Sequence, residues 1–322
     1  MEKRNLVYRP MEYSDCENIV FFLNDCSNDI SLEDWKWLVY QNPYGNSRVY
    51  LSENQQKELV GIVGYSPAKI NIYHTEYSAT IGHSLVIDPK NRNIFTYLDL
   101  MQYSLDIEYS EGVDFCIGPP NNNSYQVHKR LMSWYDFGYL DLMSIVKKRL
   151  GNQVENGKCI EINSFSEEFE KLNDNIFCEH KFYFKNDISR MNWRYTQRPS
   201  TEYTIFGHLE HDTISGYIVV KKWEYENGYR IAHIMEMQAL NASGIVFLLY
   251  QAFRYASDCD EMDIWCVAGY SYKDLLIKEG FKPKLRRPMA IKPIKKKLWD
   301  ENTMKFPIIG PASFMFGDVD TY

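Results

Sequence analysis

The chain has 322 residues, of which 45% are hydrophobic and 25% charged, and a formal net charge of −7. This length predicts two domains, each long enough to bury a core, and the acidic balance argues against a general nucleic-acid-binding protein. Seven scattered cysteines without a C-x-x-C pair favour neither a disulfide framework nor a zinc site, and they predict a reduced, cytoplasmic protein that holds no metal. The polar start of the sequence predicts no signal peptide, and no apolar run reaches the length of a membrane span.

Short strands and two capped helices are predicted for the first part of the chain. Asp15 is placed to cap a helix through Leu23, and Ser31 with Asp34 forms a capping box that begins a helix through Val39. Alternating apolar residues predict strands at 6–10, 48–51 and 59–65, the last two as a hairpin around the polar turn 52–58, and 68–80 as a loop or a further strand edge.

The next stretch, as far as residue 139, carries the strongest functional pattern. A loop that joins a strand to the N-terminus of a helix leaves backbone N–H groups free, and these suit a pyrophosphate. The sequence offers such a loop twice, and the first one contains cationic side chains. The predicted order is strand 78–87, loop 88–93, helix 94–108, strand 113–117, loop 118–124 and helix 125–132.

The second half of the chain repeats this order of elements. A strand predicted at 143–150 closes the first half, and a polar boundary follows at 151–157. The predicted elements of the second half are a helix at 161–173, strands at 203–207, 213–221, 229–237 and 262–267, and helices at 244–257 and 272–280. The repeat predicts one domain at 1–150, a linker or helical segment at 151–181, and a second domain at 182–322.

Two motifs resemble those of the Gcn5-related N-acetyltransferases (GNATs). The segment Ile87-Asp-Pro-Lys-Asn-Arg-Asn-Ile-Phe-Thr-Tyr-Leu98 resembles V-x-P-x-x-R-G-x-G-I-F-x-x-L, with a shorter loop and with asparagines where glycines are usual. Pro119-Pro-Asn-Asn-Asn-Ser-Tyr-Gln-Val-His-Lys-Arg-Leu-Met-Ser-Trp134 resembles F-P-N-x-N-S-Y-x-x-F-x-K-x-G-W, and 35–45 and 192–195 are similar to segments of tandem members. The resemblance implies an α/β (α+β) fold of two tandem GNAT-like domains, each with a central mixed, largely antiparallel sheet flanked by helices.

The same resemblance implies that the chain is an N-acyltransferase with acyl-CoA, either acetyl-CoA or 3-hydroxybutyryl-CoA, as co-substrate. Acyl transfer to an amine needs a polarised thioester carbonyl, a base for the amine and an acid for the thiolate. The catalytic residues that it implies are His83, His128 and Ser84. The residues that it implies for cofactor binding are Val86, Ile87, Lys90, Asn91, Arg92, Asn93, Ile94, Phe95, Asn123 and Ser124.

Each of these residues has an alternative role that the sequence leaves open. The two histidines could be packed or surface residues, Arg92 could be a solvated loop charge, and Asn123 and Ser124 could cap the following helix. The corresponding loop of the second half, residues 240–246, has no basic residue. We therefore expect the second domain to be a degenerate copy that does not bind the phosphates of the donor.

The acceptor is predicted from resemblance alone. The chain resembles FdhC-type enzymes, which acylate the amine of a dTDP-linked amino-deoxysugar in bacterial surface-glycan pathways such as O-antigen and lipopolysaccharide biosynthesis. A small-molecule nucleotide-sugar acceptor would need aromatic or basic contacts, and nucleic acid and membranes are not expected partners. The residues predicted to bind this substrate are Trp35, Trp37, Tyr40, Arg194, Lys221 and Trp223, although the first three could instead belong to the core.

Two other functions stay open at this stage. The acceptor could be another small amine, an aminoglycoside or a peptide N-terminus, and an acidic protein would suit a polycationic aminoglycoside. The chain could also be a catalytically degenerate acyl-CoA-binding protein. Hydrolase, zinc-protease and P-loop functions have no support, because G-x-S-x-G, H-E-x-x-H and G-x-x-x-x-G-K-[ST] are missing from the sequence.

Overall fold

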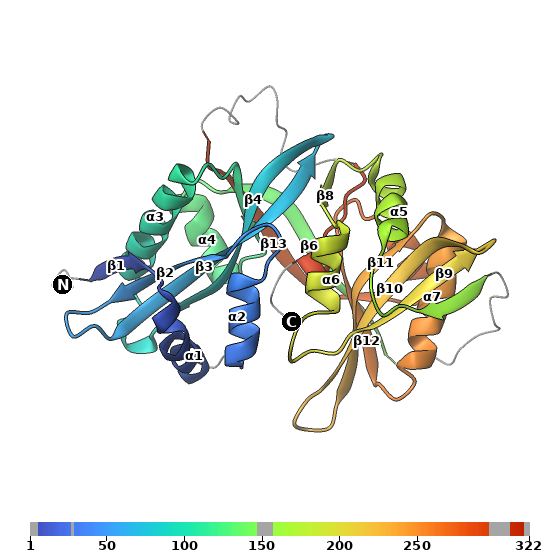
Figure 1. The fold of residues 1–322 in the computed structure, drawn as a ribbon, viewed down its shortest axis with the longest axis horizontal. Coiled ribbons are helices and arrows are strands. Elements are labelled where there is room, and N and C mark those ends of the chain that lie inside the picture. Colours follow the sequence, from blue (N-terminus) through green and yellow to red (C-terminus); the bar gives the residue numbers. More distant parts are fainter. Residues whose placement is uncertain (1–5, 27–28, 147–156, 296–309, 319–322) are drawn as a thin grey trace. The chain divides into compact units, whose positions relative to one another are not determined.

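The computed structural model describes residues 6–26, 29–146, 157–295 and 310–318 (Figure 1). By its contacts the chain divides into two compact units, which we describe separately. Unit 1 comprises Met1–Lys69, Tyr77–Gly118 and Ile291–Lys305, and unit 2 comprises Ile70–Glu76, Pro119–Ala290 and Phe306–Tyr322. None of the helices in the described ranges is long and apolar enough to cross a membrane.

Unit 1 is built on a sheet with the strand order β1-β2-β3-β4-β5, in which β4 and β5 run parallel and the β1–β2 and β2–β3 pairs are antiparallel. The end of β13 completes this sheet beside β5. Its elements are β1 (Val7–Pro10), η1 (Tyr13–Asp15), α1 (Cys16–Asp25), α2 (Leu32–Tyr40), β2 (Arg48–Glu53), β3 (Leu59–Ile72), β4 (Thr75–Ile87), η2 (Pro89–Asn91), α3 (Ile94–Ser110) and β5 (Phe115–Gly118).

Helices cover both faces of the sheet of unit 1. Successive residues of a strand point to opposite faces, and β3 shows this at two neighbouring positions. Gly64 faces the ring of His83 on β4, which lies beside Trp35 of α2. Tyr65 faces α3, where its hydroxyl lies 3.1 Å from Oγ of Ser104. The sheet is therefore buried on both sides, with α2 on one face and α3 on the other.

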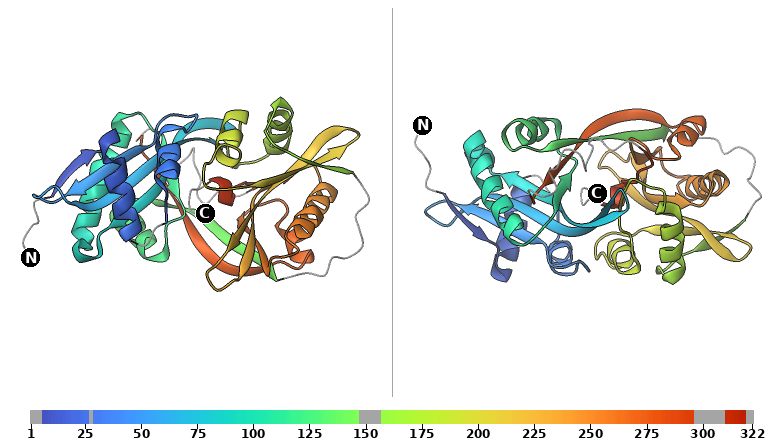
Figure 2. Two further views of the ribbon diagram at one scale, coloured as in Figure 1. Left: turned by 60° about the horizontal axis from the view of Figure 1, so that its bottom comes forward. Right: turned by 90° about the horizontal axis from the view of Figure 1, so that it is seen from above.

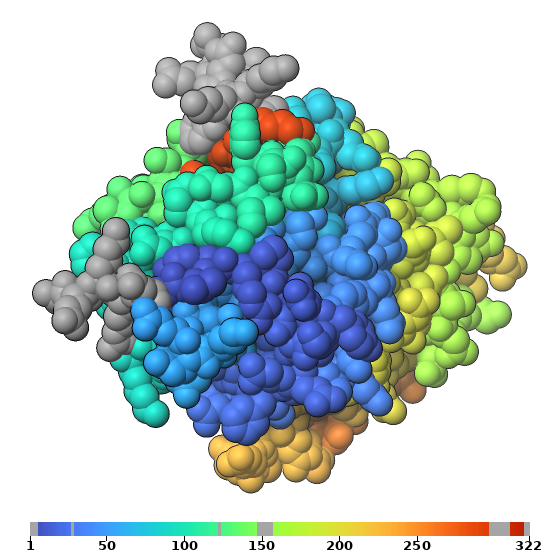
Figure 3. Space-filling model, turned by 60° about the vertical axis from the view of Figure 1, so that its left-hand side comes forward, coloured from blue at the N-terminus to red at the C-terminus, as the bar shows by residue number. Residues whose placement is uncertain are grey.

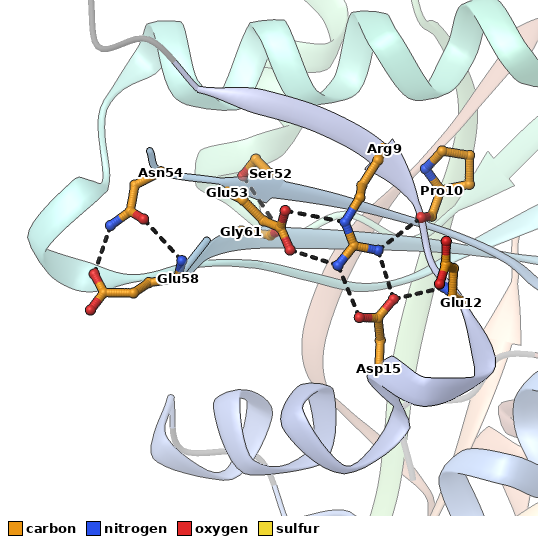
Figure 4. Close-up of polar contacts among 9 residues, drawn as sticks. All are labelled: Arg9, Pro10, Glu12, Asp15, Ser52, Glu53, Asn54, Glu58 and Gly61. Carbon is orange, nitrogen blue, oxygen red and sulfur yellow. Dashed lines mark hydrogen bonds and ion pairs between the residues drawn. The ribbon is translucent and has the colours of Figure 1, made fainter. Parts of the chain in front are cut away.

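Two ion pairs of Arg9 link the edge strand β1 to β2 and to η1. Nη2 and Nη1 of Arg9 on β1 reach carboxylate oxygens of Glu53 on β2 and Asp15 of η1, at 2.6 and 2.7 Å (Figure 4). This contact explains why Asp15 precedes α1 without capping it through its side chain, since its carboxylate is held by Arg9. The pKa of Asp15 is lowered mainly by the hydrogen bond from Arg9.

A fully buried carboxylate joins α3 to the sheet. The Glu108 side chain accepts hydrogen bonds from Arg48 (2.6 Å) and from the hydroxyl of Tyr50 (2.9 Å), both on β2. A buried charge needs such partners to offset its lost hydration. Figure 3 shows one face of unit 1, with α3 in teal and β1 and α1 in dark blue.

Unit 2 has the strand order β13-β6-β12-β11-β10-β9-β7, with β11 and β12 parallel. A short strand, β8, pairs with the end of β3. Its elements are α4 (Asn122–Leu131), β6 (Tyr135–Val146), β7 (Lys158–Glu161), α5 (Glu167–Phe177), β8 (Phe182–Phe184), α6 (Ile188–Tyr195), β9 (Thr204–Glu210), β10 (Thr213–Glu224), β11 (Arg230–Ala239), α7 (Ala242–Tyr255), β12 (Glu261–Val267), α8 (Lys273–Lys278), β13 (Lys282–Pro293) and η4 (Phe316–Asp318).

The long strands of unit 2 are buried on both faces. Helix α7 packs on β9, β10 and β11, while α5 packs on β10 and β11 from the other side (Figure 2). On β10 the ring of Tyr217 lies 5.7 Å from those of Phe165 and Phe169, and its hydroxyl donates to Asn173 of α5 at 3.0 Å. Strands buried in this way read as nearly continuous apolar runs.

Each unit completes its sheet with a strand from the other half of the sequence. Strand β6 comes from the first half, yet it pairs antiparallel with β12 in unit 2, from Leu140 opposite Val267 to Val146 opposite Glu261. Strand β13 comes from the second half, and its end belongs to unit 1 beside β5. There the N–H of Ile294 donates to the carbonyl of Asp114 at 2.8 Å. The compact units are therefore not continuous in sequence.

Most predicted elements are confirmed; the errors lie in some bounds and in the region 68–80. The region 68–80 is neither a loop nor an edge, because β3 and β4 form one long hairpin around Tyr73 and His74. Both turn residues have positive φ, 49° and 65°, the geometry of a tight two-residue hairpin turn. The predicted strand at 143–150 begins earlier, at Tyr135, the helix predicted from Tyr125 begins at Asn122, and the helix predicted at 161–173 is α5 preceded by β7.

The predicted boundaries at residues 150 and 151 lie outside the described residues, as does most of the polar segment 151–157. The linear domains 1–150, 151–181 and 182–322 remain a proposal about the repeat in the sequence. The units defined by contacts differ from them because of the exchanged strands β6 and β13.

Candidate active site

The parallel strands β4 and β5 stop pairing in the middle of β4, and we call this point the mouth of unit 1. The register pairs Ala79–Ile81 with Phe115–Ile117; β5 ends one residue later, at Gly118, whereas β4 continues to Ile87. The next residue on each strand is a glycine, Gly82 and Gly118. Beyond this point β4 lies outside its described pairing with β5, where backbone groups of a strand can bind a ligand.

The two glycines leave room at this mouth. Among the described residues, a Cβ added to Gly118 would meet no atom within 4 Å, and one added to Gly82 would meet only Cε1 of Tyr65 at 4.0 Å. Neither glycine has a φ that excludes a side chain. These glycines therefore matter because they leave space beside β4 and β5, and not because their backbone conformation requires glycine.

His83 follows directly on β4 and is held in one position. Its ring covers the backbone of Gly64, where an added Cβ would lie 2.1 Å from Cε1 of the imidazole. The ring of Trp35 lies edge-on at 6.2 Å, and Nδ1 of His83 lies 3.1 Å from Oγ of Ser84. The side chain is 9% exposed. A histidine fixed in this way can take up or relay a proton near neutral pH.

Ser84 has an unusual backbone conformation inside a strand. Its φ is +50°, in the left-handed region that costs a residue with a Cβ free energy. Such conformations persist where surrounding structure imposes them, and they concentrate at functional sites. The predicted catalytic pair of His83 and Ser84 therefore lies on a strained part of β4, one and two residues after Gly82.

The loop after β4 presents two cationic side chains. Lys90 and Arg92 are exposed, and Nη2 of Arg92 donates to the carbonyl of Ile87 at 3.2 Å. The exposed side chains of Ile94 and Phe95 follow at the start of α3. These residues can hold the phosphates of a coenzyme by charge, since a guanidinium and an ammonium both bind phosphate oxygens.

Two side chains of the loop already occupy some of its backbone N–H groups. Asp88 accepts from the N–H of Lys90 at 3.1 Å, and Asn93 accepts from the N–H groups of Phe95 and Thr96 at 3.0 Å each. The asparagine thus caps α3 where the related motif has a glycine. Pyrophosphate binding at this helix end would compete with the cap, so the donor site fits by side-chain charge better than by free backbone N–H groups.

The remaining predicted cofactor residues differ in position. Val86 is half-buried and Ile87 is buried on β4. Ser124 lies in the first turn of α4 in unit 2, where its hydroxyl and N–H both bond to Asn121. The side chain of Asn123 lies outside the described residues.

His128 belongs to α4 of unit 2 and packs on an aromatic ring. It is 6% exposed, and its imidazole centroid lies 4.6 Å from that of Trp134. The backbone fixes the same contact, because the N–H of Trp134 donates to the carbonyl of His128 at 3.2 Å. The predicted role of His128 in protonating the thiolate stays a prediction.

The structure places the predicted acceptor residues in different surroundings. Trp35 and Trp37 of α2 are 0% and 1% exposed and belong to the core, whereas Tyr40 is half-buried against Tyr13 with ring centroids 5.4 Å apart. In unit 2, Lys221 lies 5.1 Å from the ring of Trp223, which is 45% exposed. Of the predicted acceptor residues, Trp35 contacts the ring of His83 from within the core.

Arg194 lies in a buried polar cluster of unit 2 that the sequence analysis missed. Glu236 of β11 accepts from Nε2 of Gln238 (2.8 Å) and from the hydroxyl of Tyr195 (3.3 Å), while Nε of Arg194 donates to the carbonyl of Gly317 at 3.0 Å. Burial, with the nearby charge of Asp318, raises the pKa of Glu236 to about 8. A glutamate inside the apolar run of β11 was the signal that could have revealed this cluster.

Within the described part of the chain, no group of three or more His, Cys, Asp or Glu side chains is arranged to hold a metal ion. The residues around the mouth of unit 1 can instead supply a proton acceptor, His83, and charge for phosphates, Lys90 and Arg92.

No protein-family model matches the chain, and no curated protein sequence matches it. Solved structures do match it, and three of them each match 90% of the chain. A GCN5-related N-acetyltransferase from Anabaena variabilis superposes with a TM-score of 0.71 at 12% identity over 73% of that chain. A conserved protein of unknown function from Enterococcus faecalis superposes with a TM-score of 0.67 at 12% identity, also over 73% of its chain.

A tandem GNAT protein from the clavulanic acid biosynthesis pathway superposes with a TM-score of 0.64 at 9% identity and is covered over 99% of its length. Similarity at this level of identity establishes the fold. The chain therefore has the mixed α/β fold of the GNAT proteins, in the tandem arrangement that the resemblance of its motifs implies.

Proposed function

We propose that the chain is an acyl-CoA-dependent N-acyltransferase whose donor site is the mouth of unit 1. One observation carries the proposal: the pairing of β4 with β5 ends at Gly82 and Gly118, beside which the described residues leave room for an added side-chain atom, and a fixed histidine is the next residue of β4. The exposed cations Lys90 and Arg92 lie in the next loop, where a coenzyme phosphate needs a countercharge. The GNAT fold of the neighbours supports this assignment.

The residues of unit 1 suggest how the reaction would proceed. The amine nitrogen attacks the thioester carbon, its proton passes to the imidazole of His83, and the C–S bond breaks to leave a thiolate that must be protonated. Backbone N–H groups of the parted strand would stabilise the negative charge that develops on the carbonyl oxygen. The pair of Gly64 and Trp35 keeps the imidazole in place for the first proton transfer.

For the acceptor we propose the amine of a dTDP-linked amino-deoxysugar, acylated with an acetyl or 3-hydroxybutyryl group in the cytoplasm for a bacterial surface glycan. This proposal is supported by the resemblance of the sequence motifs to FdhC-type enzymes. The exposed ring of Trp223 beside Lys221 is a surface on which a base could stack. Trp35 and Trp37 would contribute indirectly, through the core.

A second candidate is an acyl-CoA-binding protein without turnover. The observation that favours it is the capped loop of unit 1, in which Asp88 and Asn93 hold three backbone N–H groups that a coenzyme pyrophosphate could otherwise use. Small amines, aminoglycosides and peptide N-termini remain alternative acceptors for an active enzyme, and an assay with several amines separates them.

Thiol release tests the proposal. Acetyl-CoA and 3-hydroxybutyryl-CoA would be offered with dTDP-amino sugars, aminoglycosides and simple amines, and released thiol measured colorimetrically. We expect release with one class of amine and a loss of about 100-fold or more in kcat for His83→Asn. The matched control is His211→Asn, at an exposed turn residue with φ of +51°. Coenzyme binding by calorimetry without release would support the second candidate, and neither binding nor release would overturn both.

A further inference from the structure

In unit 2 the pairing of the parallel strands β11 and β12 also ends before the strands do. A C-terminal segment of the same chain, residues 310–318, occupies the space at this second mouth. The register of β11 and β12 ends with the pair Ile234 and Ile264. The next residues are Met235 on β11 and Trp265 on β12. Met235 forms a bulge against β10, because Val219 pairs with Glu236 and Val220 pairs with Ile234. The mouth of unit 2 is the position just beyond this last pair.

Residues 310–318 lie against both strands at that position. The ring of Phe316 lies 4.8 Å from that of Trp265 on β12 and 5.6 Å from that of His233 on β11. An added Cβ on Gly317 would lie 3.3 Å from the carbonyl oxygen of Met235. The segment thus touches the first residue beyond the last pair on each strand.

Polar contacts fix the segment along its length. Nε2 of Gln238 on β11 donates to Oγ of Ser313 at 3.1 Å, and the N–H of Ala312 donates to the carbonyl of Gly269, just after β12, at 3.1 Å. The N–H of Ser313 donates to the carbonyl of Phe182 on β8 at 2.9 Å. These bonds anchor the part of the segment that precedes the mouth.

Two arginines of α6 hold the part inside the mouth. Nε of Arg194 donates to the carbonyl of Gly317, and Nη2 of Arg190 lies 3.9 Å from the carboxylate of Asp318. Both arginines and Asp318 are less than 5% exposed. The segment is therefore packed as part of the core and recognised through a backbone carbonyl and a carboxylate, as a bound peptide would be.

Gly317 shows how closely the site fits its occupant. A Cβ at this position would lie 1.6 Å from the hydroxyl oxygen of Tyr195, a distance that no side chain can adopt. The contrast with unit 1 is direct, because the glycines Gly82 and Gly118 at its mouth have room beside them among the described residues. Among the described residues, an added Cβ has clearance at the first mouth, whereas the second mouth is filled by a glycine-containing segment of the chain.

We propose that the mouth of unit 2 is a binding site for residues 310–318 of the same chain, a phenylalanine-rich peptide with one carboxylate side chain. The comparison with a donor site in unit 1 rests on the proposed function, whereas the binding of the segment does not. Two consequences follow. The chain binds one acyl donor, and a mouth vacated by its segment accepts the same peptide supplied in trans.

Gly317→Val tests the first step, since its side chain would collide with Tyr195 and expel the segment. Hydrogen exchange followed by mass spectrometry would compare the full-length variant with the wild type. We expect amides of 235–239 and of 312–318 to exchange at least about 10-fold faster together, because the segment covers both. The matched control is Gly228→Asn, in a turn where a Cβ meets no described atom within 4 Å. Faster exchange of 312–318 alone would overturn the proposal.

The second step adds a fluorescently labelled peptide of residues 310–318 to the same proteins. We expect saturable binding, by fluorescence anisotropy, to Gly317→Val and none to the wild type or to Gly228→Asn. Lack of binding to the vacated mouth, or equal binding to the wild type, would contradict the proposal. Should Gly317→Val not fold, Phe316→Ala weakens the packing on Trp265 without a collision and serves the same two measurements.

Calorimetry with acetyl-CoA separates this proposal from the proposed function. We expect one donor per chain in the wild type and in Gly317→Val, because the loop of unit 2 at 240–246 has no cation for the phosphates. A second donor bound to the variant would show that the vacated mouth takes acyl-CoA and would overturn the assignment as a peptide site. If neither protein bound acetyl-CoA while Gly317→Val still bound the peptide, only the proposed function would be contradicted.

Discussion

At the scale of single residues, the position of His83 depends on a missing side chain. The imidazole covers Gly64 so closely that a methyl group there would lie 2.1 Å from the ring. The neighbouring ring of Trp35 restricts movement on one side. The absence of a side chain at Gly64 thus fixes the position of the imidazole that we propose as the proton acceptor.

We predict that Gly64→Ala lowers kcat by about 100-fold, the size of the loss that a displacement of about 1 Å can cause, with little change in KM for the acyl donor. Steady-state thiol release would measure both constants. A variant that keeps kcat would show that His83 need not occupy its present position.

Gly82→Ala is the companion variant, because its Cβ meets only Tyr65 at 4.0 Å among the described residues. The added methyl group would occupy the mouth of unit 1 without moving His83. We expect KM for the donor to rise and kcat to stay within about twofold, the opposite pattern to Gly64→Ala. Equal effects of the two variants on kcat would point to a general disturbance of β4.

At the scale of elements, the loop from β4 to α3 uses backbone N–H groups for capping that the proposed donor could otherwise bind. Asn93 caps α3 through two N–H groups, and Asn241 caps α7 in unit 2 through the N–H of Gly244. Both helices are therefore stabilised at their N-termini by the same residue type. Only the first of these helices follows a loop with cations.

We predict that Asn93→Gly lowers KM for acetyl-CoA about fivefold, because the freed N–H groups can form one further hydrogen bond worth about 1 kcal/mol. The helix should lose only a few tenths of a kcal/mol of stability, as is usual for glycine in place of asparagine at an N-cap. Kinetics and thermal unfolding would be measured together.

The control for this change is Asn241→Gly, which uncaps α7 in unit 2 by the same substitution. Its KM for the donor should be unchanged, since the donor site that we propose lies in unit 1. A similar fall in KM for both variants would place the effect in overall stability, and a rise in KM for Asn93→Gly would show that the asparagine side chain itself holds the donor.

At the scale of the whole molecule, stability should depend on the protonation of the buried cluster in unit 2. Burial raises the pKa of Glu236 to about 8 and that of Asp318 to about 6, each above its unfolded value. The groups that face them are Arg190, Arg194 and Tyr195 of α6, with Gln238 on β11, Tyr217 on β10 and Tyr270 after β12. The folded state thus holds protons that the unfolded state releases.

The sign of the pH dependence follows from these shifts. A carboxyl group with a raised pKa stabilises the fold below its unfolded pKa, and this stability is lost as the pH rises through the folded pKa. We predict that the thermal midpoint of the wild type falls between pH 5 and pH 8. Glu236→Gln, which keeps the hydrogen-bonding shape without the charge, should flatten most of that fall above pH 6.

Unfolding scans at several pH values would measure this slope, and hydrogen exchange of 312–318 would locate it. The matched control is Glu58→Gln, at an exposed residue of unit 1 that should leave the slope unchanged. An identical slope in Glu236→Gln and the wild type would contradict the prediction.

Sequence patterns determine some elements fully and others only in part. The cap by Ser31 and the order of strands and helices in both halves were predictable because they depend on local chemistry. The hairpin turn at Tyr73 and His74 was not, since this pair lacks the Asn-Gly or Asp-Gly sequence typical of such turns. The exchange of β6 and β13 was missed because pairing between distant segments leaves no periodic signal.

The candidate site was predicted in the same uneven way. The loop with Lys90 and Arg92 stood out by its charge, and His83 by its place before that loop. The room beside Gly82 and Gly118, and the packing of Gly64 against His83, are properties of three-dimensional contact. The cluster of Glu236 and Asp318 joins residues about eighty positions apart, so no local pattern could place them together.

The exchange of strands also has a consequence for protein synthesis. Unit 1 receives its last strand from the end of β13, near residue 293, so its sheet cannot close while most of the chain is still being made. Contacts between segments so far apart slow folding and expose unpaired strand edges in the meantime. During synthesis, one edge of β5 therefore stays unpaired until about 170 further residues have been made. We expect the nascent first half to bind chaperones during this time.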